Sequence, residues 1–294
     1  MKDPDCVAFL QWALPRMRLR WPGFRRVRRQ ACKRIERRMS QLSCEDAAAY
    51  RHYLDRHPEE WRVLDALCRI TVTRFYRDQR VFQVLVERIL PELARTAVAR
   101  RARELRVWCA GCASGEEPYT LSIAWHLELA GRFPELNLEI LATDTDDGLL
   151  QRAADACYPW SSIRHLPQGW RSRAFKTHDG CFCLAPVFTA PVILRCHDVR
   201  TPLDAGPFDL ILCRNLAFTY FEPALQREVA RAMYERLRPA GVLLLGAHER
   251  LPEGTPGFAV IPEGQSLYRR PRTGIAACPP DPAGGRAQGT GSHG

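Results

Sequence analysis

Apolar residues recur at helical spacing through the first third of the chain. One stripe of apolar residues lies at intervals of four, at Val27, Ala31, Ile35 and Met39, and it predicts one buried face on an amphipathic helix. Ser43 is placed to cap the next helix, and two further helices are predicted near 59–69 and 79–93. Residues 70–78 between them carry β-branched side chains that disfavour a helix. Residues 1–95 are therefore expected to form a helical domain with a linker.

Short apolar runs alternate with amphipathic helices from Leu105 onward. Five runs are nearly continuous in apolar residues, at 105–109, 138–142, 192–196, 208–213 and 242–246. Such runs are typical of parallel strands covered on both faces, and their alternation with helices predicts a doubly wound α/β sheet. This second domain is expected at residues 96–271. Residues 272–294 are rich in Pro and Gly and poor in apolar residues, so a disordered tail is expected there.

The composition is that of an ordinary globular protein, with 46% hydrophobic and 26% charged residues. No run approaches the about 18 apolar residues of a membrane span, and the N-terminus does not resemble a secretory signal. We therefore expect a cytoplasmic protein without membrane insertion. The twelve cysteines are interpreted as small buried residues in a reducing compartment, with Cys109, Cys196 and Cys213 in or beside predicted strands. No second pair follows the C-x-x-C of Cys109 and Cys112, so no metal site is expected.

Positive charge is concentrated in one segment near the N-terminus. The net charge is +10, and between Arg16 and Arg38 eleven lysines and arginines accompany a single acid, Glu36. Residues 16–38, called the basic segment below, would attract a polyanion: nucleic acid, an acidic membrane or an acidic protein surface. We interpret the basic segment as a binding surface rather than as a solvated helix face.

A glycine-containing loop follows the first predicted strand at residues 110–119. It lacks the G-x-G-x-x-G spacing of dinucleotide-binding folds and the lysine of a phosphate-binding loop. Glu116 and Glu117 at the start of the next helix would repel a phosphate. They suit a ligand that carries a positive charge, such as the sulfonium or ammonium group of S-adenosylmethionine. Gly111 is the loop position where the backbone is expected to approach that ligand.

Polar residues also end the next three predicted strands. Asp144 follows the second strand and is placed to accept hydrogen bonds from ribose hydroxyls, and Asp198 follows the third as an acceptor for an adenine amino group. Arg214 and Asn215 follow the fourth. Because the carboxyl ends of parallel strands meet at one edge of a sheet, these residues predict a single ligand site there.

The sequence resembles the chemotaxis receptor glutamate methyltransferases (CheR type) from about residue 24 to 270. The resemblance is carried by the segments 106–119, 142–146 and 208–215, and residues 70–78 resemble the family's linker between its helical and catalytic domains. It implies a class I (Rossmann-like) methyltransferase sheet with a small N-terminal helical domain. The cofactor would be S-adenosylmethionine. The reaction would be methyl esterification of glutamate side chains on an acidic, chemoreceptor-like signalling protein.

The resemblance also implies a set of site residues. The residues expected to contact the cofactor, together with Gly111 of the loop, are Thr71, Thr73, Arg77, Glu117, Asp144, Asp198, Val199, Arg214 and Asn215. Arg77 and Tyr220 would lie near the reacting methyl group. A glutamate carboxylate is already ionised at neutral pH and needs no base, so Arg77 is expected to steer it.

The chain departs from the family pattern at several positions, which indicates a divergent branch. Four residues separate Arg214-Asn215 from Tyr220 instead of the usual three. Either the loop bulges so that Tyr220 keeps its place, or Phe218 or Thr219 stands there instead. Thr71 stands where an asparagine is expected. The stretch 161–191, which corresponds to a small three-stranded insertion that grips a receptor peptide in some members, has no Gly-x-Gly turn.

Two other functions stay open from the sequence alone. One is a methyltransferase for nucleic acid or a small molecule, with the basic segment binding nucleic acid. Against nucleic acid, no Asn-Pro-Pro-Tyr-like segment follows the fourth strand and no aromatic platform lies on the basic segment. The other is a regulatory module that binds S-adenosylmethionine without turnover, which only the altered spacing before Tyr220 favours.

Overall fold

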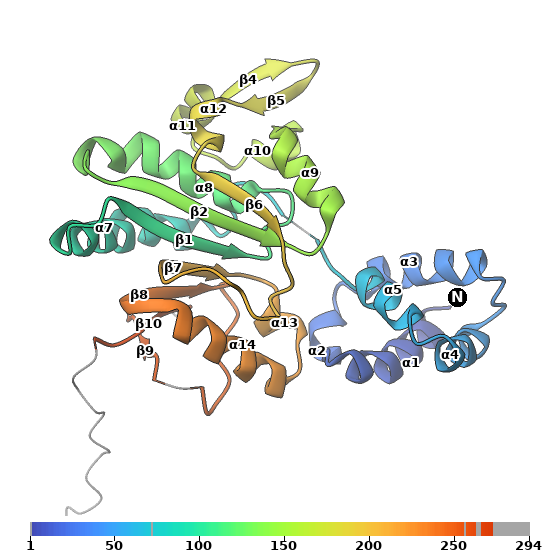
Figure 1. The fold of residues 1–294 in the computed structure, drawn as a ribbon. Coiled ribbons are helices and arrows are strands. Elements are labelled where there is room, and N and C mark those ends of the chain that lie inside the picture. Colours follow the sequence, from blue (N-terminus) through green and yellow to red (C-terminus); the bar gives the residue numbers. More distant parts are fainter. Residues whose placement is uncertain (1, 72, 256, 263–265, 273–294) are drawn as a thin grey trace, which may run out of the picture.

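The computed structural model describes residues 2–71, 73–255, 257–262 and 266–272. Figure 1 shows a helical unit beside a sheet that carries helices on its faces. The helices of the helical unit are α1 (Asp3–Ala13), α2 (Trp21–Phe24), α3 (Arg28–Gln41), α4 (Ala47–Arg56) and α5 (Glu60–Leu67). The predicted apolar stripe lies on α3, where Ala31, Ile35 and Met39 are buried. The predicted disordered tail falls almost entirely outside the described residues.

The N-cap of α4 is Asp46, so the prediction of Ser43 as the cap is wrong. Asp46 has an extended backbone, and its carboxylate accepts the N–H of Ala49 at 2.7 Å. Ser43 has a φ of +54°. This left-handed conformation lies in the turn before the helix, whereas an N-cap residue needs an extended backbone to direct its side chain at the first turn.

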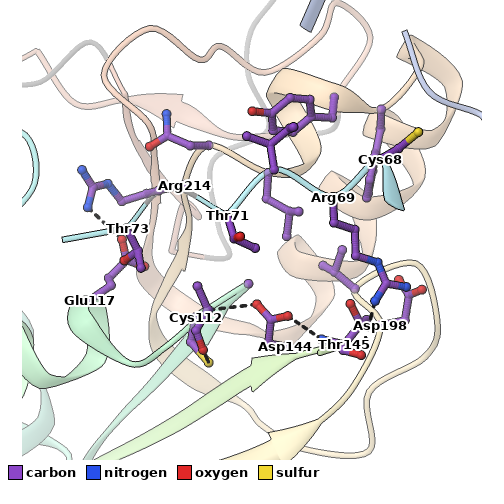
Figure 2. A pocket seen from close by; sticks show the side chains of 18 of the residues that line it. Cys68, Arg69, Thr71, Thr73, Cys112, Glu117, Asp144, Thr145, Asp198 and Arg214 are labelled. Carbon is purple, nitrogen blue, oxygen red and sulfur yellow. Dashed lines mark hydrogen bonds and ion pairs between the residues drawn. The ribbon is translucent and has the colours of Figure 1, made fainter. Parts of the chain in front are cut away.

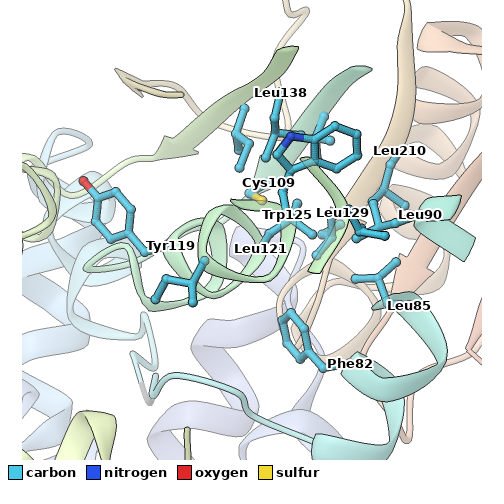
Figure 3. Packing of buried hydrophobic residues seen from close by; sticks show 14 of the residues in the cluster. Phe82, Leu85, Leu90, Cys109, Tyr119, Leu121, Trp125, Leu129, Leu138 and Leu210 are labelled. Carbon is cyan, nitrogen blue, oxygen red and sulfur yellow. The ribbon is translucent and has the colours of Figure 1, made fainter. Parts of the chain in front are cut away.

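The helices before the sheet pack with the sheet and not with the helical unit. A single helix is predicted at 79–93, and the structure has a longer run of α6 (Gln79–Val84), a π-helical turn (Leu85–Ile89) and α7 (Leu90–Ala99). Phe82, Leu85 and Leu90 of this run share one core with residues of the sheet (Figure 3). We propose that the limit between the two domains lies in the segment 68–78.

The sheet has seven strands in the order β6-β2-β1-β7-β8-β10-β9. Their bounds are β1 (Glu104–Ala110), β2 (Asn137–Asp144), β6 (Val192–Cys196), β7 (Phe208–Cys213), β8 (Leu237–Leu245), β9 (Ala259–Val260) and β10 (Leu267–Arg269). The five predicted strands are parallel to one another, and β10 pairs antiparallel with β8 and β9. The α/β fold class is confirmed.

Strand β6 is exposed, although its apolar sequence predicts a strand covered on both faces. Among the strands of the described residues it is the first of the sheet, and its one pairing partner there is β2. Ile193 is 49% exposed, and Cys196 is exposed as well, so the prediction that Cys196 is buried is wrong. An apolar run alone does not distinguish an edge strand from a central one, because the neighbours of a strand are decided by the fold.

Alternate residues of the central strands enter two separate cores. Val107 and Cys109 of β1 pack with α6, α7 and α8 (Glu116–Ala124). Trp108 and Ala110 of the same strand belong to the core that also contains the apolar residues of the helical unit and of α14 (Pro223–Arg236). The helical unit is therefore joined to the catalytic sheet through one continuous apolar core.

A second, three-stranded sheet has the order β3-β5-β4, with β3 (Cys157–Tyr158), β4 (Phe175–His178) and β5 (Cys181–Leu184). Disulfides join Cys157 to Cys183 in this sheet and Cys6 to Cys32 between α1 and α3. The expectation that the cysteines are reduced is wrong for these four. The sequence separation gives no sign of either pairing, because register and helix packing bring the partners together.

No helix in the described part of the chain is long and apolar enough to cross a membrane.

Candidate cofactor and active site

A cavity of about 300 Å³ lies at the carboxyl edge of the sheet, between the sheet, the linker and the helical unit. Figure 2 shows polar side chains around it from the end of β2 (Asp144), from the residue after β7 (Arg214) and from the linker (Thr71 and Thr73). All of the residues predicted for the site line this one cavity: Thr71, Thr73, Arg77, Gly111, Glu117, Asp144, Asp198, Val199, Arg214, Asn215 and Tyr220. Their individual roles stay predictions, but they meet in one place as the sequence predicts.

The loop after β1 fits only glycine at two positions. Gly111 has a φ of +79°, and a Cβ there would lie 2.5 Å from the side chain of Leu216. Gly115 has a φ of +91°, and its Cβ would lie 2.7 Å from the ring of Tyr119. A side chain at either position would strain the backbone and meet a neighbouring side chain, and of the two glycines Gly111 lines the cavity.

Asp144 ends β2 and is held by three backbone N–H groups. Its Oδ2 accepts from Ala113 at 2.8 Å, and its Oδ1 accepts from Thr145 at 2.8 Å and Asp146 at 3.1 Å. A carboxylate has about four acceptor positions, so Oδ2 keeps one position for a donor in the cavity. This agrees with the predicted hydrogen bond to a ribose hydroxyl.

Arg214 connects the linker to the start of α8. Its side chain is buried, with 2% exposed, and it donates to Glu117 and to Asp78 at 2.7 Å each and to the carbonyl of Arg77 at 3.0 Å. Its Nε is buried with no hydrogen-bond partner among the described residues. Arg214 therefore fixes the backbone of Arg77 as well as the carboxylate of Glu117.

Burial raises the pKa of the Glu117 carboxyl, and the positive charges of Arg214 and Arg77 partly oppose this. Arg77 also acts electrostatically on Tyr220, whose pKa is raised chiefly by burial. The guanidinium of Arg77, the carboxyl of Glu117 and the phenol of Tyr220 thus lie within electrostatic range of one another around the cavity, and Tyr220 is neutral at physiological pH.

The additional residue before Tyr220 is accommodated in a helical turn, α13 (Ala217–Tyr220). The N–H groups of Thr219 and Tyr220 both donate to the carbonyl of Leu216. Tyr220 lines the cavity, whereas Phe218 is buried elsewhere and Thr219 donates its hydroxyl to Glu249 at 2.6 Å. Of the three candidates for the tyrosine position, the structure therefore places Tyr220 at the site.

Glu249 is a buried residue of this region to which the sequence analysis gave no role. Besides the hydroxyl of Thr219, it accepts the N–H groups of Asn215 and Gly246 at 2.7 Å each. It therefore ties the loop after β7 to the end of β8. The signal for it was present in the sequence, as a glutamate three residues after the glycine that ends a predicted strand.

Much of the basic segment is occupied within the protein. Arg18 pairs with Glu222 and Glu228, Arg28 with Asp3 and Arg38 with Glu60. The guanidinium groups of Arg20 and Arg34 bind backbone carbonyls. The interpretation of the basic segment as a binding surface stays a prediction, and it is limited to the cations that the fold leaves unpaired. The exposed cations of the basic segment without an ion-pair partner among the described residues are Arg16, Arg25, Arg26, Arg29, Lys33 and Arg37.

The residues around the cavity fit the predicted cofactor. The volume of the cavity lies at the lower end of the range for small-molecule sites. The carboxylates of Glu117 and Asp144 suit a ligand with a positive charge and hydroxyl groups, and the backbone of Gly111 lines the same cavity. Within the described ranges, no group of three or more His, Cys, Asp and Glu side chains is arranged to hold a metal ion.

A cavity of this composition at this edge of a doubly wound sheet places the protein among the S-adenosylmethionine-dependent methyltransferases. Residues 71–265 match the family model of the CheR methyltransferase, SAM binding domain. The chain belongs to the CheR methyltransferase family, as the sequence resemblance indicates.

Three relatives illustrate the similarity. A 104.1 kDa protein encoded in the hypE 3' region of Rhodobacter capsulatus is 33% identical over 247 residues, which cover 83% of this chain and 25% of that protein. Chemotaxis protein methyltransferase 2 of Vibrio cholerae is 32% identical over 193 residues, 64% of this chain and 65% of that one. The chemotaxis protein methyltransferase of Escherichia coli is 28% identical over 246 residues, 80% of each. The match thus spans a quarter of the first relative and just under two thirds of the second.

Proposed function

We propose that this protein methylates glutamate side-chain carboxylates on an acidic, chemoreceptor-like signalling protein. The observation that carries the proposal is the position of Arg77. It lies in the cavity wall with its backbone held by Arg214, and its charge acts on both Glu117 and Tyr220. The names of the relatives, chemotaxis protein methyltransferases, support the same function.

The chemistry asks little of the protein beyond binding and orientation. S-adenosylmethionine, when bound, supplies an electrophilic methyl group on a positively charged sulfur. The carboxylate of Asp144 would hold the ribose, and the acidic side chain of Glu117 would face the positively charged part of the cofactor. Arg77 would hold the acceptor carboxylate through paired hydrogen bonds, and the rings of Tyr220 and Phe24, 5.1 Å apart, would exclude water from the acceptor.

The remaining cations of the basic segment supply a surface for the partner. Arg29, Lys33 and Arg37 lie four residues apart on α3 and are exposed, so they form one row on the helix surface. We call these three residues the cationic row. Phe24 of α2, five residues before Arg29, lines the cavity, and we infer that an acidic protein bound on the cationic row brings its glutamates toward the cavity.

The experiment that tests the function uses radiolabelled cofactor and host lysate. Protein carboxyl methyl esters hydrolyse in mild base, whereas N-methyl groups do not. We expect base-labile label on a protein. Base-stable label on protein would contradict the proposal. Label on nucleic acid or on a small molecule would contradict it as well and would favour the alternative methyltransferase. No transfer at all, with intact cofactor binding, would favour a regulatory module.

We also propose that the protein works in the cytoplasm. The two disulfides are more typical of oxidising compartments, and they provide the test. Host cells would be fractionated, and the thiols of the protein would be alkylated before and after reduction. The mass of the alkylated protein then gives the number of cysteines held in disulfides in each fraction. Fractionation of the protein outside the cytoplasm would contradict the proposal.

A further inference from the structure

Arg200 joins the helical unit to the wall of the cofactor cavity. It follows β6, and its guanidinium donates to both oxygens of Asp198, with Nε–Oδ1 at 3.0 Å and Nη2–Oδ2 at 2.7 Å. Another edge of the same guanidinium donates to both oxygens of Asp65, with Nη1–Oδ1 and Nη2–Oδ2 at 2.9 Å each. Asp65 belongs to α5, the last helix of the helical unit, and all three residues line the cavity.

The carboxylate of Asp198 is largely engaged within this arrangement. Its Oδ1 accepts the backbone N–H of Arg200 at 2.9 Å, and the N–H of Nε is shared between Oδ1 and Oδ2 at 3.0 Å each. Nη2 donates to Oδ2 at 2.7 Å. These three N–H groups occupy three of the roughly four acceptor positions of a carboxylate, so Asp198 orients Arg200 and keeps about one position for an adenine amino group.

Arg69 extends the contact between the two units. Its guanidinium donates to Asp65 at 3.4 Å and to the carbonyl of Thr145 at 3.3 Å, in the loop that follows Asp144. Figure 2 shows Arg69, Thr145 and Asp198 on the same side of the cavity. Two acids and two arginines thus bridge α5 to the ends of β2 and β6, where the adenosine part of the cofactor is expected.

We propose that Arg200 is a positioning residue, which fixes the helical unit over the cofactor cavity by pairing with Asp65 and Asp198 at once and so sets the affinity for S-adenosylmethionine. Paired arginine–carboxylate contacts are directional, and a lysine cannot occupy both edges. The proposal rests on the cofactor site alone and is independent of the methyl acceptor.

The test is calorimetric titration of the full chain with S-adenosylhomocysteine, the demethylated cofactor. Arg200→Gln and Asp65→Asn should each weaken binding about tenfold, the size of one charge-assisted hydrogen bond. The double variant should be little weaker than either single one, because both changes break the same bridge. Arg200→Lys should be intermediate.

Arg18→Gln is the matched control. Arg18 also joins the helical unit to the catalytic domain through two carboxylates, Glu222 at 2.8 Å and Glu228 at 2.6 Å, but none of the three lines the cavity. The affinity of the Arg18→Gln variant for S-adenosylhomocysteine should equal that of the wild type. An equal loss in this control would show a general effect of domain docking and would overturn the proposal.

Hydrogen exchange of α5 gives a second readout that does not depend on activity. In the wild type, S-adenosylhomocysteine should slow exchange of the α5 amides, and this protection should be reduced in Asp65→Asn even at saturating ligand. If Asp65→Asn matches the wild type in both affinity and exchange, Arg200 acts only through Asp198 and the bridge between domains has no role. If the wild type itself does not bind the ligand, the cofactor site is wrong, which is a separate failure.

Discussion

Individual side chains at the cavity are held by partners that the sequence does not reveal. Arg214 has the residue type and place that the family resemblance implies, yet its guanidinium is engaged by Glu117, Asp78 and the Arg77 carbonyl. Removing one partner of such a buried pair leaves an uncompensated charge. Arg214 is therefore expected to act mainly by fixing Glu117 and the linker.

Asp144→Ala should weaken binding of S-adenosylmethionine by about 1–3 kcal/mol, the usual range for losing a charged hydrogen-bond partner. Asp144→Asn is the matched variant, because it keeps the size of the side chain and one acceptor oxygen. It should lose less binding free energy than Asp144→Ala. Calorimetry measures both, with thermal unfolding as the control for the three backbone N–H groups that Asp144 accepts. Unchanged affinity in Asp144→Ala would remove this residue from the site.

Arg77→Ala should lower the rate of methyl transfer about 10²-fold, as expected when a positioned charge is lost. Arg77→Lys should recover only part of this, because a lysine does not provide paired hydrogen bonds. Tyr220→Phe should lower the rate of methyl transfer less than Arg77→Ala does, if the ring of Tyr220 only packs beside the methyl group. Initial rates on the identified acceptor measure these effects, and cofactor affinity serves as the control. Full activity of Arg77→Ala would rule out the mechanism proposed above.

At the scale of elements, short segments owe their conformation to distant acids. The turn that places Tyr220 at the cavity is fixed by Glu249, which lies 30 residues beyond Thr219 in the chain. The linker contains Tyr76 and Asp78 with φ values of +55° and +61°. The N–H of Tyr76 donates to Thr120 at 3.0 Å, and Asp78 pairs with Arg214. Contacts to the catalytic domain thus stabilise backbone that is unfavourable in isolation.

Within the helical unit, Glu60→Gln should lower the free energy of unfolding at pH 7 by about 3 kcal/mol. The side chain of Glu60 is 4% exposed, and it pairs with Arg38 and accepts the hydroxyl of Tyr50 at 2.9 Å. Hydrogen bonds from Arg38 hold the pKa of Glu60 below its ordinary value of 4.5. Its contribution is therefore present above pH about 4.5 and is lost as the pH falls through the lower, folded pKa.

Urea unfolding at pH 7 and at pH 3 measures this difference. The wild type should lose more stability than Glu60→Gln between the two pH values, because the variant has no carboxyl to protonate. Equal losses in the two proteins would show that the pair of Glu60 with Arg38 does not stabilise the helical unit.

At the scale of the whole molecule, the exposed charge of the helical unit should decide which partner is bound. Reversing the cationic row, Arg29, Lys33 and Arg37, to Glu should lower methyl transfer to protein at least tenfold by repelling an acidic partner. Affinity for the cofactor should not change. Arg28 is left out, because its guanidinium already pairs with Asp3 at 2.9 Å.

The matched control reverses Arg95, Arg101 and Arg103 to Glu. These three are exposed near the start of β1, at the sheet edge opposite the cavity, and their reversal changes the net charge equally. Transfer to protein should then be close to that of the wild type. An equal loss in both triple variants would indicate a non-specific effect of net charge. Tight, salt-dependent binding of nucleic acid to the wild type would favour the alternative partner.

The sequence by itself determined the α/β fold, the five parallel strands and the site residues that meet at their carboxyl ends. It could do so because buried parallel strands are continuous apolar runs and because such strands bring their ends to one edge. A residue at the end of a strand, such as Asp144, or directly after it, such as Arg214, is thus placed at the site by local sequence alone.

The tertiary structure alone decided which charges are paired, which strand lies at the edge and which cysteines are joined. Arg200 meets Asp65 across 135 residues, Cys157 meets Cys183 through strand register, and β6 is exposed because no strand pairs with its outer side. Tyr220, and not Phe218 or Thr219, lies at the cavity because Glu249 and the carbonyl of Leu216 fix the turn before it. These features depend on contacts between residues far apart in the chain, and periodicity and local spacing carry no information about such contacts.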